Sequence, residues 1–176
     1  MQYRFGKGES LNQFDAVILM GHGSRVPDAG KGMEMVAERL LGDGTFKIVE
    51  TCYMERLGAR FADALGKCVE QGAKSVLLLP YFLHTGLHTR VDIPMMMRRE
   101  AKKHEGIKVV FGNNLGFDEL LVELVRKRIY ESAHLKDVRE IDIKERDDFP
   151  LGRNEHVFVP MHQDEAEHFK DHKHEH

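Results

Sequence analysis

The chain's 176 residues suffice for one domain with a real core, and its apolar fraction of 41% and charged fraction of 31% are typical of a globular protein. The net charge of −3 provides no basic field for nucleic acid, and two cysteines cannot build a disulfide framework. No apolar run approaches the roughly 18 residues of a membrane span, and the amino-terminal stretch lacks the apolar core of a signal peptide. We therefore expect a cytoplasmic protein that binds neither nucleic acid nor membranes.

Short apolar runs alternate with amphipathic patterns along most of the chain. Strands are predicted at 15–20, 46–52, 75–79 and 107–111, and helices at 29–41, 54–71, 92–104 and 118–131. Strands that are apolar on both faces fit a parallel sheet covered by helices on both sides. The predicted fold is a doubly wound, mainly parallel four-stranded α/β sheet. The last helix has five apolar residues at helical spacing that should face inward: Leu120, Leu121, Leu124, Val125 and Ile129.

The composition divides the chain into three parts. Residues 1–14 are polar and predict a flexible leader, and residues 15–133 form the α/β domain. Residues 134–176 carry 7 Lys/Arg against 12 Asp/Glu and predict an acidic appendage, with one candidate strand at 156–160. Five of the 11 histidines fall in the last 16 residues, which indicates a polar, His-rich end.

Two histidine-bearing loops follow the first and third strands, where an open parallel sheet binds its ligands. The first is Gly21-His22-Gly23-Ser24-Arg25, whose glycines permit a sharp turn and a close approach to a ligand. The second contains His84, His88 and Asp92 at intervals of four residues. Two neutral imidazoles suit Co²⁺, Ni²⁺, Fe²⁺ or Zn²⁺. The structural alternatives are a glycine turn holding one histidine, and Asp92 as the N-cap of the helix that Pro94 enters.

An acidic residue follows the second strand. Glu55 is a candidate proton acceptor or metal ligand, or equally an acidic residue in the first turn of a helix. Cys52 and Cys68 are expected to be core thiols.

The motifs GHGSR, VETCYMERLGARFADAL and PYFLHTGLHTRVDIP resemble the small sirohydrochlorin chelatases of the CbiX type over about residues 15–131. The resemblance implies a homodimer that inserts a divalent metal into sirohydrochlorin without an organic cofactor, with Co²⁺ for cobalamin biosynthesis as the first expectation. It assigns His22 and His88 as catalytic metal ligands and places Glu55 where many members carry an acid. His84 is not at a family histidine position and remains an optional helper. Ala59 stands where a proline is usual, which leaves the geometry near Glu55 open.

Sirohydrochlorin carries many carboxylates, so guanidinium and hydroxyl groups are expected at the rim of the site. Arg25, Arg90 and Ser24 are the candidates, whereas Arg98 and Arg99 fit a solvated helix face better. The tail histidines predict either a metal store or an idle acidic tail: His168, His172, His174 and His176.

Three other functions remain open at this stage. Insertion of iron for sirohaem, or of nickel for a nickel coenzyme, would use the same tetrapyrrole, and imidazole ligands distinguish these metals poorly. A non-enzymatic metal carrier would use the same histidines without a tetrapyrrole. A phosphate-handling hydrolase built on the glycine loop ranks last, because the loop lacks a lysine and a second acid.

Overall fold

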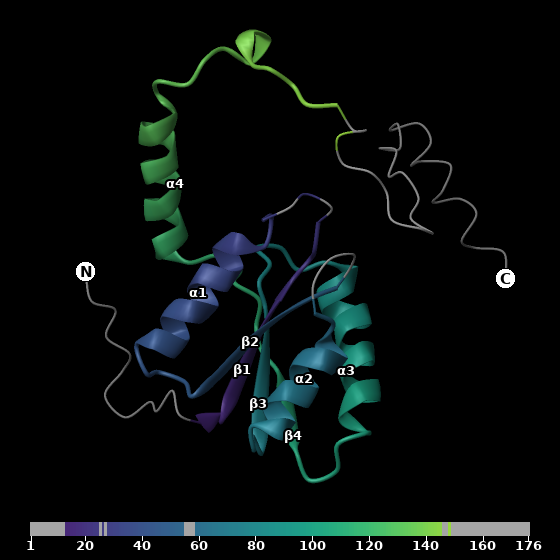
Figure 1. Ribbon diagram of the computed structural model, residues 1–176. Helices are drawn as coiled ribbons and strands as arrows, with labels where there is room; N and C mark the ends of the chain where they lie inside the picture. Colours follow the sequence, from purple (N-terminus) through teal and green to yellow (C-terminus); the bar gives the residue numbers. More distant parts are fainter. Residues whose placement is uncertain (1–12, 25, 27, 55–58, 146–147, 149–176) are drawn as a thin grey trace, which may run out of the picture. The chain divides into compact units, whose positions relative to one another are not determined.

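The computed structural model describes residues 13–24, 26, 28–54, 59–145 and 148 (Figure 1). The chain divides into two units, Met1–Lys144 and Glu145–His176, and every assigned element lies in the first. The elements in chain order are β1 (Ala16–Gly21), α1 (Lys31–Gly42), β2 (Ile48–Tyr53), α2 (Phe61–Glu70), β3 (Ser75–Pro80), a π-helical turn (His88–Asp92), α3 (Ile93–Ala101), β4 (Lys108–Phe111), α4 (Glu119–Ser132) and a 3₁₀ turn (Val138–Glu140).

The four strands form one parallel sheet in the order β2-β1-β3-β4. The predicted doubly wound α/β fold is therefore confirmed. Asp15 ties the start of β1 to that of β3, because its carboxylate accepts hydrogen bonds from the backbone N–H groups of Lys74 and Ser75, both at 2.8 Å. These bonds, with one from the Ser75 hydroxyl, hold the pKa of Asp15 below its ordinary value.

The core has two layers, one on each side of the sheet. Alternate residues of β1 and β3 point to the side of α2 and α3, where Ile18, Leu78 and Phe61 are completely or almost completely buried. On the opposite side, Val17 and Leu19 pack with Met33 of α1. Within the described segments, no helix has the length and apolarity needed to cross a bilayer.

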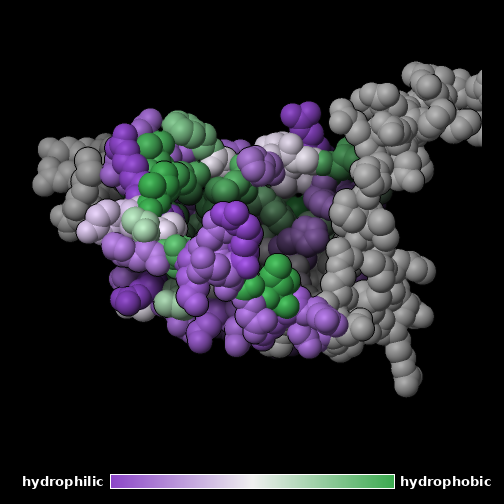
Figure 2. Space-filling view, turned by 90° about the horizontal axis from the view of Figure 1, so that it is seen from above, coloured by the Kyte–Doolittle hydropathy of each residue, from purple (hydrophilic) through white to green (hydrophobic). Residues whose placement is uncertain are grey.

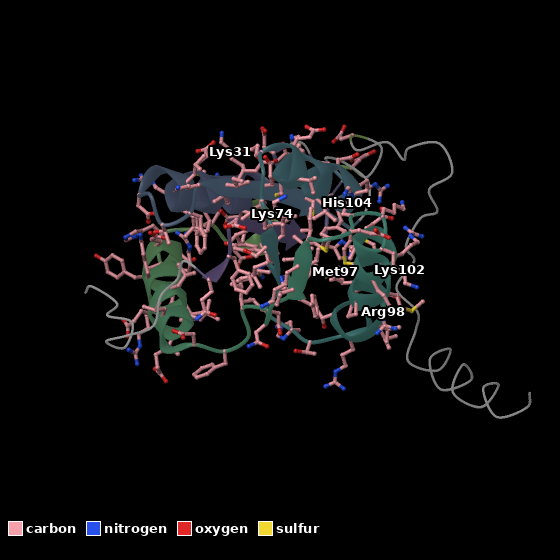
Figure 3. All side chains as sticks on the ribbon, turned by 90° about the horizontal axis from the view of Figure 1, so that it is seen from below. Lys31, Lys74, Met97, Arg98, Lys102 and His104 are labelled. Carbon is pink, nitrogen blue, oxygen red and sulfur yellow. The ribbon has the colours of Figure 1, made fainter. Side chains whose placement is uncertain are left out.

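The surface of α3 follows the amphipathic pattern of its sequence. Met97 is 5% exposed and packs into the core, whereas Arg98 and the C-cap residue Lys102 are exposed (Figure 3). Arg99 is exposed as well. Arg99 also pairs with Glu100 at 3.2 Å. Arg98 and Arg99 therefore occupy the solvated helix face that the sequence favoured.

The helix predicted from residue 54 begins later, at Phe61. The Tyr53 backbone N–H donates to the Ala59 carbonyl at 2.9 Å, and the Arg60 guanidinium donates to the Met54 carbonyl at 2.7 Å. Helix α2 begins directly after Arg60, and Asp63 caps it by accepting from the Arg60 backbone N–H. Residue 55, which the sequence places near the start of this helix, lies outside the described residues.

The prediction that the apolar residues of the last helix face inward is wrong. Helix α4 buries none of its residues, although Leu121 is partly covered. The exposed fractions of Leu120, Leu124, Val125 and Ile129 are 53%, 44%, 55% and 67%. The apolar spacing identified the helix correctly but could not specify what covers it.

Candidate metal-binding site

The carboxyl ends of β1 and β3 bring the two histidine loops to one edge of the sheet. The Tyr81 backbone N–H donates to the Met20 carbonyl at 2.7 Å, so the pairing of the two strands continues up to the loops. Gly21 packs closely, since a Cβ there would lie 3.2 Å from Met33 and 3.3 Å from Tyr53. Gly23 has a φ of 95°, a conformation that favours glycine. The turn therefore favours glycine at position 23, and the close packing against Met33 and Tyr53 favours it at position 21.

His22 and His88 lie side by side at this edge. Their ring centroids are 5.7 Å apart, and the ring planes are inclined by 72°. Metal–imidazole bonds of about 2.0–2.1 Å place the centroids of two rings on one ion roughly 5–6.5 Å apart. The pair thus has the spacing required to share one metal ion.

Each imidazole has an acceptor beside its Nδ1 atom. His22 Nδ1 lies 3.3 Å from the Gly23 carbonyl oxygen, and His88 Nδ1 lies 2.8 Å from Asp92 Oδ2. Because both partners accept hydrogen bonds, the proton of a neutral ring belongs on Nδ1, which leaves the Nε2 lone pair available to a metal. The side chains of His88 and Asp92 are 48% and 55% exposed, so a ligand can reach them from solvent.

The π-helical turn contains both His88 and Asp92, and their side chains are hydrogen-bonded to each other. Asp92 precedes α3, but its backbone is helical and its side chain makes no capping hydrogen bond. Asp92 therefore occupies the N-cap position of α3, as the structural alternative expected, but its carboxylate caps no backbone N–H group and instead pairs with His88 four residues earlier. Thr89 is buried, and its hydroxyl donates to the Gly86 carbonyl at 2.9 Å and accepts from the Gly86 N–H at 3.0 Å, which fixes the loop.

The remaining predicted site residues are not all brought together. His84 is exposed, and in the described part of the chain no hydrogen bond or ring contact joins it to His22 or His88. The Ser24 hydroxyl accepts the Val26 backbone N–H at 3.0 Å and so shapes the glycine loop. Arg90 is exposed in the π-helical turn, with its backbone N–H donating to Gly86 at 3.1 Å. The other predicted residues lie outside the described residues: Arg25, Glu55, His168, His172, His174 and His176.

Aromatic residues that the sequence reasoning missed border the histidines. The ring of Phe82 meets His22 edge-on with centroids 6.5 Å apart. Tyr53, at the end of β2, donates its hydroxyl to Glu34 of α1 at 2.7 Å, and burial with this bond raises the pKa of Tyr53 to about 12. A Cβ at Gly30 would lie only 1.9 Å from the Tyr53 hydroxyl oxygen. In the sequence, the signal that could have identified Tyr53 and Phe82 was their position at or just after the end of a strand.

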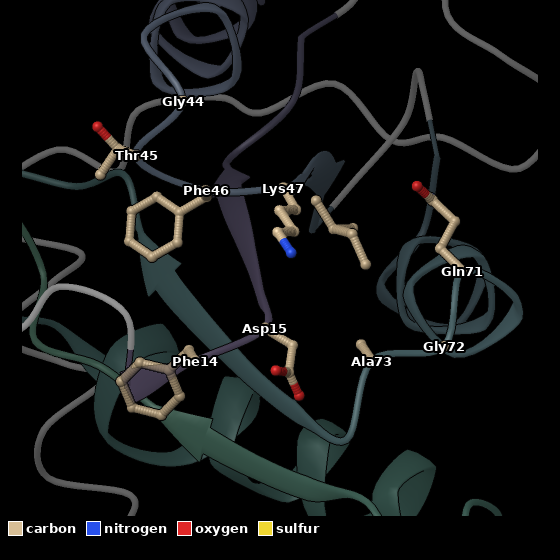
Figure 4. Close-up of a pocket in the computed structure, with 10 residues that line it drawn as sticks. Phe14, Asp15, Gly44, Thr45, Phe46, Lys47, Gln71, Gly72 and Ala73 are labelled. Carbon is tan, nitrogen blue, oxygen red and sulfur yellow. The ribbon is translucent and has the colours of Figure 1, made fainter.

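A cavity of about 280 Å³ adjoins His22, between the glycine loop, the start of α1 and the tyrosines at 53 and 81. Figure 2 looks onto this end of the sheet and shows a recess between hydrophilic side chains with hydrophobic side chains at its floor. A larger cavity, of about 370 Å³, lies at the opposite end of the strands beside Asp15 and Lys47 (Figure 4). Its described lining residues include no histidine, and backbone N–H groups already engage the Asp15 carboxylate. Of the two cavities, the smaller one is therefore the one that is lined by a histidine of the pair, His22.

The two cysteines are core residues, as predicted. Cys52 and Cys68 are 0% exposed, and burial raises the pKa of each thiol to about 12. Neutral thiols are poor metal ligands. Across the described residues, no group of three or more His, Cys, Asp and Glu side chains is arranged to hold a metal ion.

A doubly wound parallel sheet with two imidazoles at the ends of β1 and β3 defines an α/β domain suited to binding a transition metal at its carboxyl edge. The model of the CbiX family matches residues 16–132, and the chain belongs to this family. The resemblance seen in the motifs is thereby confirmed.

Characterised relatives insert different metals. The chain is 34% identical over 130 residues to the chloroplastic sirohydrochlorin ferrochelatase of Arabidopsis thaliana, covering 71% of this chain and 58% of that protein. It is 31% identical over 137 residues to the sirohydrochlorin cobaltochelatase of Methanopyrus kandleri, covering 66% of this chain and 96% of that protein. The sirohydrochlorin chelatase SirB from Bacillus subtilis subspecies spizizenii in complex with cobalt has a TM-score of 0.62 and 29% identity, over 67% of this chain and 50% of SirB. The chain thus spans about half the length of some of its relatives.

Proposed function

We propose that the protein inserts a divalent metal, Co²⁺ in the first instance, into sirohydrochlorin for cobalamin biosynthesis. The observation that carries the proposal is the pairing of His22 and His88 at 5.7 Å. Family membership and relatives that act on sirohydrochlorin support the same substrate. A cytoplasmic location remains part of the proposal.

The reaction exchanges two pyrrolic protons of the macrocycle for one dication. Two imidazoles hold Co²⁺ more loosely than a closed three- or four-ligand protein site would, so the ion can pass to the four ring nitrogens. Asp92 accepts the Nδ1–H of His88 and keeps the opposite nitrogen directed to the metal. The two protons pass to Glu55 or to one of the histidines once it has released the ion. No nucleotide or organic cofactor takes part.

The substrate's carboxylates supply a second set of contacts. We assign Arg25 and Arg90 to bind them, because a guanidinium group can donate two parallel hydrogen bonds to one carboxylate. Ser24 offers a hydroxyl beside His22, and His84 is an optional helper on the exposed loop. These side chains would hold the macrocycle over the histidine pair while the metal transfers.

A second copy of the chain completes the site in this proposal. The cavity of about 280 Å³ beside His22 lies at the lower limit of sites for drug-sized ligands, and a tetrapyrrole is large by that standard. One domain therefore provides one wall, and a homodimer would provide the second.

The choice of metal is tested by adding Co²⁺, Fe²⁺ and Ni²⁺ separately to purified protein and sirohydrochlorin and following the absorption spectrum. We expect the fastest enzyme-dependent spectral change with Co²⁺. A faster change with Fe²⁺ or Ni²⁺ would reassign the protein to the alternative chelatase functions. Metal binding without any enzyme-dependent spectral change would instead support the alternative function of a non-enzymatic metal carrier.

The acidic tail is a separate part of the proposal. His168, His172, His174 and His176 alternate with carboxylates and would bind spare metal for delivery to the site. Removing residues 161–176 should lower the number of bound metal ions per chain and leave turnover at saturating metal unchanged. An unchanged stoichiometry would remove the storage role.

A further inference from the structure

The loop between β3 and the π-helical turn has few hydrogen bonds of its own. Residues 81–86 form neither helix nor strand. Among the described residues, the backbone-to-backbone hydrogen bonds of this segment lie at its two ends. The Tyr81 N–H donates to the Met20 carbonyl, and the Gly86 carbonyl accepts from the Arg90 N–H. Such a segment must be held by other parts of the chain if the imidazole beyond it is to keep a fixed position.

Asn114 holds the middle of this loop from the neighbouring strand. It is partly buried and follows β4, the strand that pairs with β3. Its side-chain NH₂ group donates to the carbonyl oxygens of Phe82 at 3.1 Å and Leu83 at 3.5 Å, and its amide oxygen accepts from the Thr85 hydroxyl at 3.2 Å. Because backbone carbonyls can only accept, the NH₂ group must face them, which leaves the amide oxygen for the hydroxyl. Both ends of one amide are thus bonded to one loop.

The segment that carries Asn114 is itself fixed to the sheet. The Gly112 backbone N–H donates to the Leu78 carbonyl at 2.8 Å, which continues the pairing of β4 with β3. A Cβ at position 112 would lie 3.0 Å from the Leu77 side chain and 3.1 Å from the same carbonyl oxygen, so the backbone there lies directly against β3. Asn114 therefore extends from backbone that the sheet holds in place.

The loop that Asn114 holds is in contact with both histidines of the pair. At one end, the ring of Phe82 meets the ring of His22 edge-on, with centroids 6.5 Å apart. At the other end, the N–H and the carbonyl of Gly86 are both bonded to the hydroxyl of buried Thr89, which lies in the π-helical turn beside His88. A shift of the loop would therefore move both imidazoles relative to each other.

We propose that Asn114 is a positioning residue for the metal site, which holds the loop after β3 so that His22 and His88 keep the spacing needed to share one ion. The inference deepens the proposed function and rests on it, because it concerns the same pair of imidazoles. Without the amide, loop conformations that separate the two rings become accessible. The affinity for metal then falls in proportion to the fraction of chains in which the pair is still formed. Asn114 acts through the loop and is not itself a ligand of the ion.

Titration of the full chain with Co²⁺, without tetrapyrrole, tests the effect on metal binding. The binding that His88→Ala removes is assigned to the histidine pair, so ions bound elsewhere on the chain are not counted. Asn114→Ala should raise the dissociation constant of this component by about tenfold, which is about 1.4 kcal/mol and within the range that the lost hydrogen bonds contribute. Asn114→Asp keeps an acceptor for Thr85 but turns a carboxylate oxygen toward the Phe82 carbonyl, so it should not recover the loss.

The adjacent asparagine, Asn113, provides the matched control. Its side chain is exposed and makes no hydrogen bond in the part of the chain that the structure describes. Asn113→Ala should therefore leave the dissociation constant within about twofold of the original. Thr85→Val removes one bond of the network and should have a smaller effect than Asn114→Ala, whereas Thr85→Ser keeps the hydroxyl and should restore the affinity. Equal constants for the parent chain and Asn114→Ala, or equal effects of both asparagine variants, would overturn the proposal.

Amide hydrogen exchange tests the loop itself and requires no metal. The backbone N–H groups of Gly86 and Arg90 are hydrogen-bonded within the loop and the turn, and both should exchange about tenfold faster in Asn114→Ala than in the parent chain. Leu65→Ala, at a fully buried position in α2, weakens the whole domain and should leave the exchange of these two amides unchanged. This comparison distinguishes a loosened loop from a general loss of stability.

The two measurements separate this inference from the proposed function. Unchanged exchange of Gly86 and Arg90 in Asn114→Ala would overturn the inference, whatever the protein does with sirohydrochlorin. Cobalt binding that does not depend on His88 would instead refute the proposed function, and faster exchange in Asn114→Ala would then retain the role of the asparagine in holding the loop.

Discussion

Asp92 provides the sharpest test of how the histidine pair is held. Its carboxylate accepts the Nδ1–H of His88 at 2.8 Å and makes no capping hydrogen bond to α3. Asp92→Ala removes this acceptor, so His88 can turn or carry its proton on the nitrogen that should bind metal. Because the two side chains are 48% and 55% exposed, the substitution should alter the free energy of unfolding by less than about 1 kcal/mol.

The expected effect lies in metal affinity. Removing a residue that orients a ligating histidine typically weakens metal binding by about 10–100-fold, or about 1.4–2.8 kcal/mol. Initial rates of cobalt insertion measured against Co²⁺ concentration should show a rise of this size in the KM for metal, with kcat at saturating metal much less affected. Asp92→Asn retains an oxygen acceptor and should recover part of the loss.

A matched control removes another exposed carboxylate that pairs with a basic side chain, Asp137, whose side chain is 41% exposed. Asp137 pairs with Arg139 at 2.7 Å, and Asp137→Ala should leave the metal dependence unchanged. If Asp92→Ala had the KM of the original protein, the orientation of His88 by Asp92 would be refuted.

Three further predictions concern the metal-ligating histidine His88, the buried core residue Leu78 and the dependence of stability on pH through Asp15. His88→Ala should abolish detectable cobalt insertion in the spectrophotometric assay at all Co²⁺ concentrations, because a single imidazole remains. Leu78→Ala, at a side chain with no exposed surface, should lower the free energy of unfolding in urea by about 2–5 kcal/mol. The pKa of Asp15 is lower in the folded chain than in the unfolded one, so its stabilisation holds above about pH 4 and is lost as the pH falls through the folded value. Asp15→Asn should therefore show a smaller drop in Tm between pH 6 and pH 3.

Each of these has an outcome that contradicts it. Near-normal insertion by His88→Ala would remove that histidine from the chemistry. A change below about 1 kcal/mol for Leu78→Ala would mean that the sheet interior adapts to the lost volume. An equal acid response of the Asp15→Asn variant would assign the acid sensitivity to other carboxylates.

The order of strands and helices followed from the sequence because the strands are buried on both faces. Runs such as Val76–Leu79 are apolar at every position, a pattern that parallel sheets require and amphipathic strands lack. The meeting of His22 and His88 followed from the same topology, since β1 and β3 are neighbours and both loops leave the same edge.

The features that the sequence left open or misplaced depend on contacts that no local pattern specifies. Asp92 stands directly before a helix that begins with Ile93-Pro94, which is typical of an N-cap, yet a histidine four residues earlier takes its carboxylate. The start of α2 was predicted too early: the helix begins at Phe61, and before it the Tyr53 backbone N–H bonds to the Ala59 carbonyl. The spacing of Leu120 and Leu124 predicts an apolar face, but it does not specify a surface to cover that face, and these two side chains are 53% and 44% exposed.

The shared ion between His22 and His88 is tested most directly by X-ray absorption spectroscopy of the protein loaded with one equivalent of Co²⁺, without tetrapyrrole. Residues 161–176 are removed beforehand so that the tail histidines cannot bind the ion. The account predicts two imidazole ligands at about 2.0–2.1 Å, reduced to one in His22→Ala and in His88→Ala. A cobalt environment with no imidazole, or one that neither substitution changes, would contradict it.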